Sequence, residues 1–97
     1  MHDVDTAVLR TFLTLAATRN FSRTGDLIGR SQSAVSGQIR KLEEALDCRL
    51  IARDTRNVRL TAEGERLLVH ARQMVSAADA MLARFRDGDI AGEVRFG

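Results

Sequence analysis

The first stretch of the chain carries apolar residues at the three- and four-residue spacing of an amphipathic helix. Residues 5–18 have one apolar face, and Thr11 falls on the opposite, polar face. The apolar positions are Val8, Leu9, Phe12, Leu13 and Ala16. Asp3, Asp5 or Thr6 can cap the start of this segment. We therefore expect a first helix over residues 5–18.

A second, shorter helix follows after a break in the pattern. Asn20 is typical of a residue that ends a helix, and Ser22 is typical of one that caps the next. The pattern predicts that this helix runs to about Ile28 and buries Leu27 and Ile28. Gly29 suits a left-handed residue at its end, because glycine has no Cβ to clash there.

The third predicted helix has two faces of different character. Ser31 can cap a helix over residues 32–46. Its narrow apolar stripe is Val35, Ile39, Leu42 and Leu46, and its polar face is Gln32, Ser33, Ser36, Gly37 and Arg40. A face that is only solvated carries Glu and Lys more often, whereas short side chains allow close approach to a groove. Gly37 costs roughly 0.5–1 kcal/mol relative to alanine in mid-helix, which close approach would explain.

Two short extended segments predict a β-hairpin with a basic tip. Residues 50–52 and 58–60 flank residues 53–57, which include Arg53, Arg56 and Asn57. An isolated two-stranded hairpin is marginal in water, so this one must pack on the helices. We expect Leu50 and Leu60 to anchor it.

The last helical segment repeats its apolar positions every 3.5 residues, the period of a coiled-coil seam. Thr61 caps it, and residues 62–86 would extend roughly 37 Å. The seam consists of Leu67, Leu68, Ala71, Met74, Val75, Ala78, Met81, Leu82 and Phe85. This length exceeds what so small a domain can cover, so we expect part of the seam to form a homodimer. The alternative is a helix that only covers its own core.

The distribution of charge along the chain indicates which kind of partner it binds. The 97 residues carry a formal net charge of +2, and residues 19–60 alone carry +4, flanked by segments at −1 each. Such local clustering favours contact with phosphates, although a solvated basic surface is the alternative. The single cysteine, Cys48, excludes a disulfide framework and points to a reducing compartment. No apolar run is long enough for a membrane span, and the first ten residues lack the hydrophobic core of an export signal.

Three helices, a basic hairpin and a long helix describe a winged helix-turn-helix, and the residues match a known family. The chain resembles the N-terminal region of LysR-type bacterial transcriptional regulators over nearly its whole length. The matching residues are Asn20-Phe21-Ser22-Arg23, Ser31-Gln32-Ser33-Ala34-Val35-Ser36 and Gln38-Ile39-Arg40-Lys41-Leu42-Glu43, then Leu50, Arg53, Leu60-Thr61 and Glu63-Gly64. The resemblance implies a mainly α fold with a winged helix-turn-helix in residues 1–60 and a linker and dimerisation helix in 61–87. Residues 88–97 would lead into an effector-binding domain that these 97 residues do not include.

The resemblance also implies a cytoplasmic regulator that binds double-stranded DNA at a pseudo-palindromic operator as a homodimer, with a tetramer plausible at full length. The third helix would enter the major groove, where Gln can pair with adenine and Ser can donate or accept. The wing would supply a minor-groove contact and phosphate contacts. The DNA-binding residues expected are Ser22, Arg23, Ser31, Gln32, Ser33, Ser36, Gly37, Arg40, Arg53, Arg56 and Asn57. We expect no cofactor in these residues and a small-molecule effector in the absent domain.

This chain departs from the family pattern at four places. Thr24-Gly25 stands where the family usually has Ala-Ala, which weakens the second helix intrinsically. Asp47 replaces a glycine after the third helix, and Leu50-Ile51 replaces Leu-Phe. Gly37 stands where a basic residue is common, which removes one contact and puts the operator preference in doubt.

Other chemistry has little support in the sequence. His2, His70 and Cys48 are too few and too scattered for a structural metal site, which usually needs four ligands. Glu43 and Glu44 project about 100° apart, so they form no acid–base pair, and Glu43 is expected to bind the wing backbone or an arginine. An enzyme is therefore disfavoured. Two alternatives stay open: a helical protein-interaction module, and a molybdate-type regulator with a similar winged helix.

Overall fold

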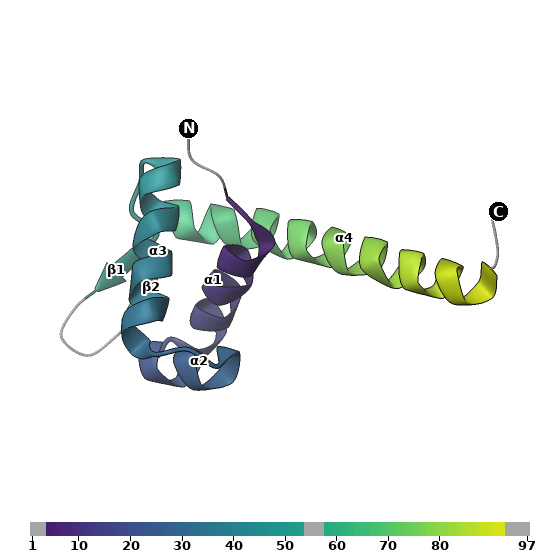
Figure 1. Cartoon of the computed structure of the whole chain (residues 1–97). Coiled ribbons are helices and arrows are strands. Elements are labelled where there is room, and N and C mark those ends of the chain that lie inside the picture. The colour runs from purple at the N-terminus through teal and green to yellow at the C-terminus, as the bar shows by residue number, and fades with distance from the viewer. Residues whose placement is uncertain (1–3, 54–57, 93–97) are drawn as a thin grey trace.

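The computed structural model describes residues 4–53 and 58–92 and folds them as four helices and one hairpin (Figure 1). The helices are α1 (Thr6–Thr18), α2 (Phe21–Ile28), α3 (Gln32–Leu46) and α4 (Ala62–Gly92), and the strands are β1 (Ile51–Arg53) and β2 (Val58–Leu60). The first three helices pack together, and the hairpin joins α3 to α4. The predicted mainly α fold with a winged helix-turn-helix is confirmed.

Side-chain and backbone caps set the starts and ends of the short helices. Asp5 accepts a hydrogen bond from the N–H of Val8 at 2.9 Å and begins α1. Gly29 ends α2 in the left-handed region at φ 72°, as predicted. The hydroxyl of Ser31 accepts from the N–H of Ala34 at 3.1 Å and begins α3, also as predicted.

The predicted cap of α2 is wrong. Arg19, not Asn20, ends α1, in the left-handed region at φ 57°. Asn20 is therefore extended and accepts a hydrogen bond from the N–H of Arg23 at 2.9 Å, which makes it the N-cap of α2. Ser22 lies inside the helix instead.

The core lies where α1, α3, the hairpin and the first half of α4 meet. Its largest buried side chains include Phe12, Leu15, Ile39, Leu42 and Leu50. These residues come from α1, from α3 and from the segment directly before β1, so the core fixes α3 and the base of the hairpin on α1. Leu60 is only half-buried, and Ile51 is the fully buried partner opposite it in the hairpin.

Two expectations about burial are wrong. Leu27 is 62% exposed, because the residues that α2 buries fully are the small Thr24 and Gly25. Thr11 is buried, because its hydroxyl donates to the amide oxygen of Gln38 on α3 at 2.6 Å. A buried hydroxyl with such a partner avoids the cost of desolvation.

The hairpin is antiparallel, and its register pairs Ile51 with Leu60 and Arg53 with Val58. The strands begin and end within one residue of the predicted segments. Leu50 precedes β1 and is fully buried, as expected of an anchor. Residues 54–57 lie outside the described part of the chain.

The fourth helix runs without a break from Ala62 to Gly92 and gives the molecule its 55 Å long axis. Figure 1 shows it extending well beyond the other helices. The expected end near residue 87 is wrong. A single glycine costs a helix only about 1 kcal/mol. The helix therefore continues through Gly88 instead of ending there.

Candidate nucleic-acid interface

The polar face of α3 forms an open hollow at the surface. Five residues line it: Gln32, Ser33, Ser36, Gly37 and Arg40. The hollow measures about 540 Å³, and Gln32, Ser33 and Arg40 are exposed while the other two are half-buried. Val35, Ile39 and Leu42 on the opposite face are buried in the core. The predicted two-faced helix is thus present, and its polar face points away from the domain.

The start of α2 lies beside the start of α3. The hydroxyl of Ser22 donates a hydrogen bond to the side-chain oxygen of Gln32 at 3.0 Å. This contact orients the Gln32 amide, whose nitrogen stays available as a donor. Arg23 is the next residue on α2 and is exposed. The fold therefore brings Ser22, Arg23 and Gln32 together, although they come from two helices.

The cations near this face are available for an external anion. Within residues 4–53 and 58–92, neither Arg23 nor Arg40 forms an ion pair. Arg40 is exposed and lines the hollow. Ser31 uses its hydroxyl oxygen to cap α3, as its position at a helix start predicts. Unpaired guanidinium groups beside a helix N-terminus are suited to phosphate.

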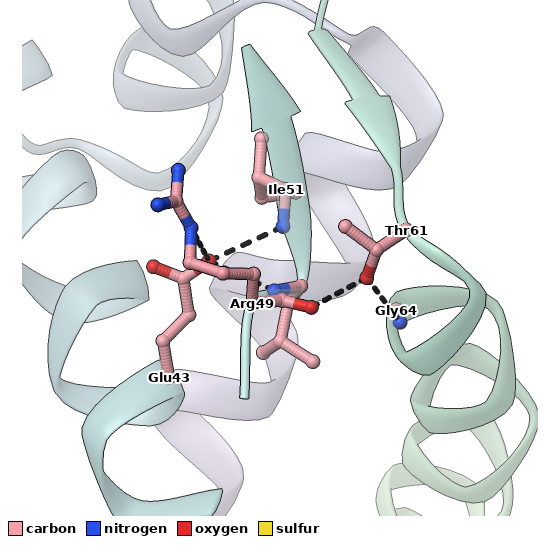
Figure 2. Close-up of polar contacts among 6 residues, drawn as sticks. Glu43, Arg49, Ile51, Thr61 and Gly64 are labelled. Atoms are coloured by element: carbon pink, nitrogen blue, oxygen red, sulfur yellow. Dashed lines mark hydrogen bonds and ion pairs between the residues drawn. The ribbon is translucent and has the colours of Figure 1, made fainter. Parts of the chain in front are cut away.

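The base of the wing is held by one carboxylate (Figure 2). Oε2 of Glu43 accepts hydrogen bonds from the backbone N–H groups of Leu50, at 2.8 Å, and Ile51, at 3.2 Å. The Nε of Arg49 lies 3.8 Å from the same oxygen. The expectation that Glu43 binds the wing backbone or an arginine is confirmed. Of the predicted wing contacts, Arg53 is the last residue of β1, and Arg56 and Asn57 lie outside the described residues.

A threonine joins the same strand to α4. Thr61 caps α4 by accepting a hydrogen bond from the N–H of Gly64 at 3.0 Å, and its hydroxyl donates to the carbonyl of Arg49. Its own N–H donates to the carbonyl of Leu50 at 2.9 Å. Figure 2 shows the two contacts of the Thr61 hydroxyl beside those of Glu43. The wing is therefore fixed to α3 on one side and to α4 on the other.

The predicted dimerisation seam on α4 divides into two parts. Ala71 and Val75 are buried in the core of this chain, and Leu67 and Leu68 pack partly against it. Ala78 is half-buried. Four larger apolar side chains of the seam are open instead: Met74 and Met81 are each 50% exposed, Leu82 is 45% and Phe85 is 67%. Only this second part is free to meet another surface.

Comparison with known proteins identifies the family. Residues 7–65, from α1 to the first turn of α4, match the family model described as bacterial regulatory helix-turn-helix protein, lysR family. The chain belongs to this family. A curated relative, the HTH-type transcriptional regulator DgdR of Burkholderia cepacia, is 41% identical over 90 residues, which are 93% of this chain and 31% of the relative. This chain thus spans about a third of the length of that LysR-family relative.

Two solved LysR-type structures have the same fold. DarR of Vibrio fischeri, solved in complex with DNA, superposes with a TM-score of 0.86 at 31% identity, over 93% of this chain and 31% of its own. The BenM DNA-binding domain, solved with catB site 1 DNA, superposes with a TM-score of 0.83 at 29% identity, over 92% of this chain and 98% of its own. Both likenesses extend beyond the helix-turn-helix into α4.

Two contacts of this LysR-family domain have no signal in the sequence. Arg10 on α1 forms a hydrogen-bonded ion pair with Asp79 on α4, 69 positions away. Thr11 bonds Gln38 across 27 positions. Pairing over such separations depends on the tertiary fold, so no local spacing reveals it.

The described residues meet the requirements neither of a metal site nor of a membrane span. Within the described residues, no three His, Cys, Asp or Glu side chains gather at a spacing that would hold a metal ion. Cys48 is half-buried against the core, His70 is exposed on α4, and His2 lies outside the described residues. None of the described helices combines the length and apolar character that crossing a membrane requires.

Proposed function

We propose that this domain binds double-stranded DNA sequence-specifically and serves as the DNA-binding part of a transcriptional regulator. The observation that carries the proposal is the open polar face of α3, on a chain whose backbone superposes on two LysR-type proteins solved with DNA. An α-helix fits the major groove, and side chains at its start reach the base edges. The carboxamide and hydroxyl groups of Gln32, Ser33 and Ser36 suit that role.

Contacts around α3 would position the domain on the DNA backbone. Arg23 and Arg40 are exposed and unpaired among the described residues, so they can meet phosphates without breaking an internal ion pair. Ser22 and Ser31 lie at the starts of α2 and α3. Gly37 offers backbone rather than a side chain. From the wing, Arg53, Arg56 and Asn57 complete the proposed contacts, with Arg56 in the minor groove.

The proposal includes a dimer formed through α4. The apolar side chains of Met74, Met81, Leu82 and Phe85 are exposed along α4. Burying them against a second copy would remove apolar area from water. A dimer with two copies of α3 matches a pseudo-palindromic operator. In a longer protein, an effector-binding domain after α4 would bind a small molecule and support a tetramer in the cytoplasm.

Selection of binding sites from a random duplex pool tests this function. We expect the 97-residue chain to enrich paired half-sites, and affinity for them to fall steeply as salt rises, because phosphate contacts release counterions. Replacing Gln32 and Ser33 together with alanine should abolish the sequence preference, while Ser76→Ala on α4 should preserve it. Ser76 is exposed on a different helix and serves as the matched control. Binding to no duplex, or binding that ignores both sequence and salt, would contradict the proposal.

A charge-reversed wing separates DNA binding from a protein-interaction module. Arg53, Arg56 and Arg59 changed to Glu should abolish DNA binding, because three phosphate-attracting charges become repulsive. Circular dichroism of the same variant should show an intact fold. Undiminished DNA affinity in a folded variant would remove the wing from the proposed interface.

A further inference from the structure

Gly37 differs in its surroundings from Gly25, Gly29 and Gly64. A Cβ added at Gly25 would lie 2.4 Å from the carbonyl oxygen of Arg30, and one at Gly64 would lie 2.3 Å from that of Leu50. Gly29 has a φ of +72°, which L side chains rarely adopt. At these three positions the fold itself requires glycine.

Gly37 has neither reason. A Cβ built there meets no atom within 4 Å, and its φ lies outside the left-handed region. The residue lies in the middle of α3, where glycine is less favourable than alanine because it loses more backbone freedom on folding. Nothing among residues 4–53 and 58–92 therefore accounts for the missing side chain, so we look for its effect in what α3 meets from outside.

The position of Gly37 shows where that effect would act. It lines the hollow on the polar face of α3 together with Ser33, Ser36 and Arg40. Those side chains stand around a stretch of bare backbone. The amides of that stretch are engaged in the α-helix, so the exposed surface at Gly37 is a Cα that offers no donor or acceptor. This patch can therefore make a favourable contact only with an apolar group.

The major groove presents one apolar group at its base edges, the C5-methyl of thymine. We propose that Gly37 determines specificity by admitting a thymine methyl against the backbone of α3. The proposal rests on the proposed function, namely that α3 enters the major groove. A side chain at position 37 would occupy the space that the methyl needs, and it would also hold the helix farther from the base edges.

Gly37→Ala tests the proposal because its two expected effects have opposite signs. Thermal stability should rise by a few degrees, since alanine favours the helix and no atom blocks its methyl. Affinity for the operator selected by the unaltered chain should fall about tenfold, the size of one mismatched base pair. Ser76→Ala is the matched control, because it also raises helix propensity at an exposed position and should leave DNA affinity unchanged.

Uracil scanning of the selected operator identifies the group that is read, because uracil lacks only the methyl. With the unaltered chain, replacing one particular thymine in a half-site should weaken binding about fourfold, as expected for one buried methyl. With Gly37→Ala the same replacement should have little effect. Equal affinity of the alanine variant with an unchanged uracil profile would overturn this inference alone. Failure of the unaltered chain to enrich any duplex would overturn the proposed function as well.

Discussion

The carboxylate of Glu43 accepts a hydrogen bond from the backbone N–H of Leu50 over 2.8 Å and so joins α3 to the base of the hairpin. The same oxygen also accepts from the next N–H along the strand. Glu43 is only 17% exposed in its side chain, so these bonds form largely out of water. One carboxylate therefore links the helix proposed to enter the groove directly to the wing beside it.

Removing that carboxylate should destabilise the domain. Glu43→Ala leaves two backbone N–H groups near the core without their acceptor, and each such loss costs about 1–3 kcal/mol. Urea unfolding followed by circular dichroism measures the change in the free energy of unfolding. Glu44→Ala is the control, since Glu44 is exposed on the same helix and should change stability by less than about 0.5 kcal/mol. Similar losses for both variants would mean that the Glu43 bonds contribute nothing specific.

The ion pair between α1 and α4 should appear in the titration of Asp79. The hydrogen bond from Arg10 lowers the pKa of the Asp79 carboxyl below its ordinary value, because it favours the ionised form. The pair's contribution to stability is therefore present above the ordinary pKa of an aspartate and is lost as the pH falls through the lowered pKa. NMR titration of the Asp79 carboxyl measures this directly, and Arg10→Gln should return its pKa to the ordinary range. An Asp79 pKa that does not respond to Arg10→Gln would exclude the pair in solution.

The part-buried hydrogen bond between Thr11 on α1 and Gln38 on α3 should contribute more to stability than the exposed side-chain hydrogen bonds do. Thr11→Val keeps the shape of the side chain but removes the hydroxyl that bonds Gln38, and we expect a loss of about 1–2 kcal/mol in the free energy of unfolding. Combining it with Gln38→Leu should cost less than the two single losses added together, because the partners are removed together. Strict additivity in this double-mutant cycle would show that the two side chains do not interact.

The two parts of the α4 seam should respond differently to a charge. Met81→Glu with Phe85→Glu alters only exposed positions, so we expect a folded monomer. Ala71→Glu places a carboxylate at a fully buried position and should unfold the domain instead. Sedimentation equilibrium gives the assembly state, and circular dichroism gives the helix content. We expect the unaltered chain to dimerise at micromolar concentration, and a 10.7 kDa species alone would contradict this.

Local signals in the sequence predict most of the fold. Side-chain caps act within three or four residues, so Ser31 and Gly29 are correctly placed from the sequence alone. The apolar stripe of α3 is also correct apart from Leu46, which is 40% exposed at the helix end. Asp47 follows it in the left-handed region at φ 54°, where the family usually has glycine. Asparagine and aspartate tolerate this region better than other side chains do.

Packing between elements explains what the sequence pattern misses. Apolar character predicts that Leu27 is buried, but α2 buries Thr24, which bonds Thr18 on α1, and Gly25, which lies close to the turn before α3. Polarity predicts that Thr11 faces water, but its partner comes from another helix. The division of the α4 seam likewise depends on which of its residues pack on the core of this chain, which the period of the seam does not encode.

The separation of the two faces of α3 bears on how such a domain can change over generations. Gln32, Ser33 and Arg40 are exposed and take no part in the core, whereas Val35, Ile39 and Leu42 carry the packing. Substitutions on the outer face therefore alter what is read at little risk of unfolding. A duplicated copy of this chain can drift toward a different target one residue at a time, while natural selection on folding acts almost entirely on the inner face.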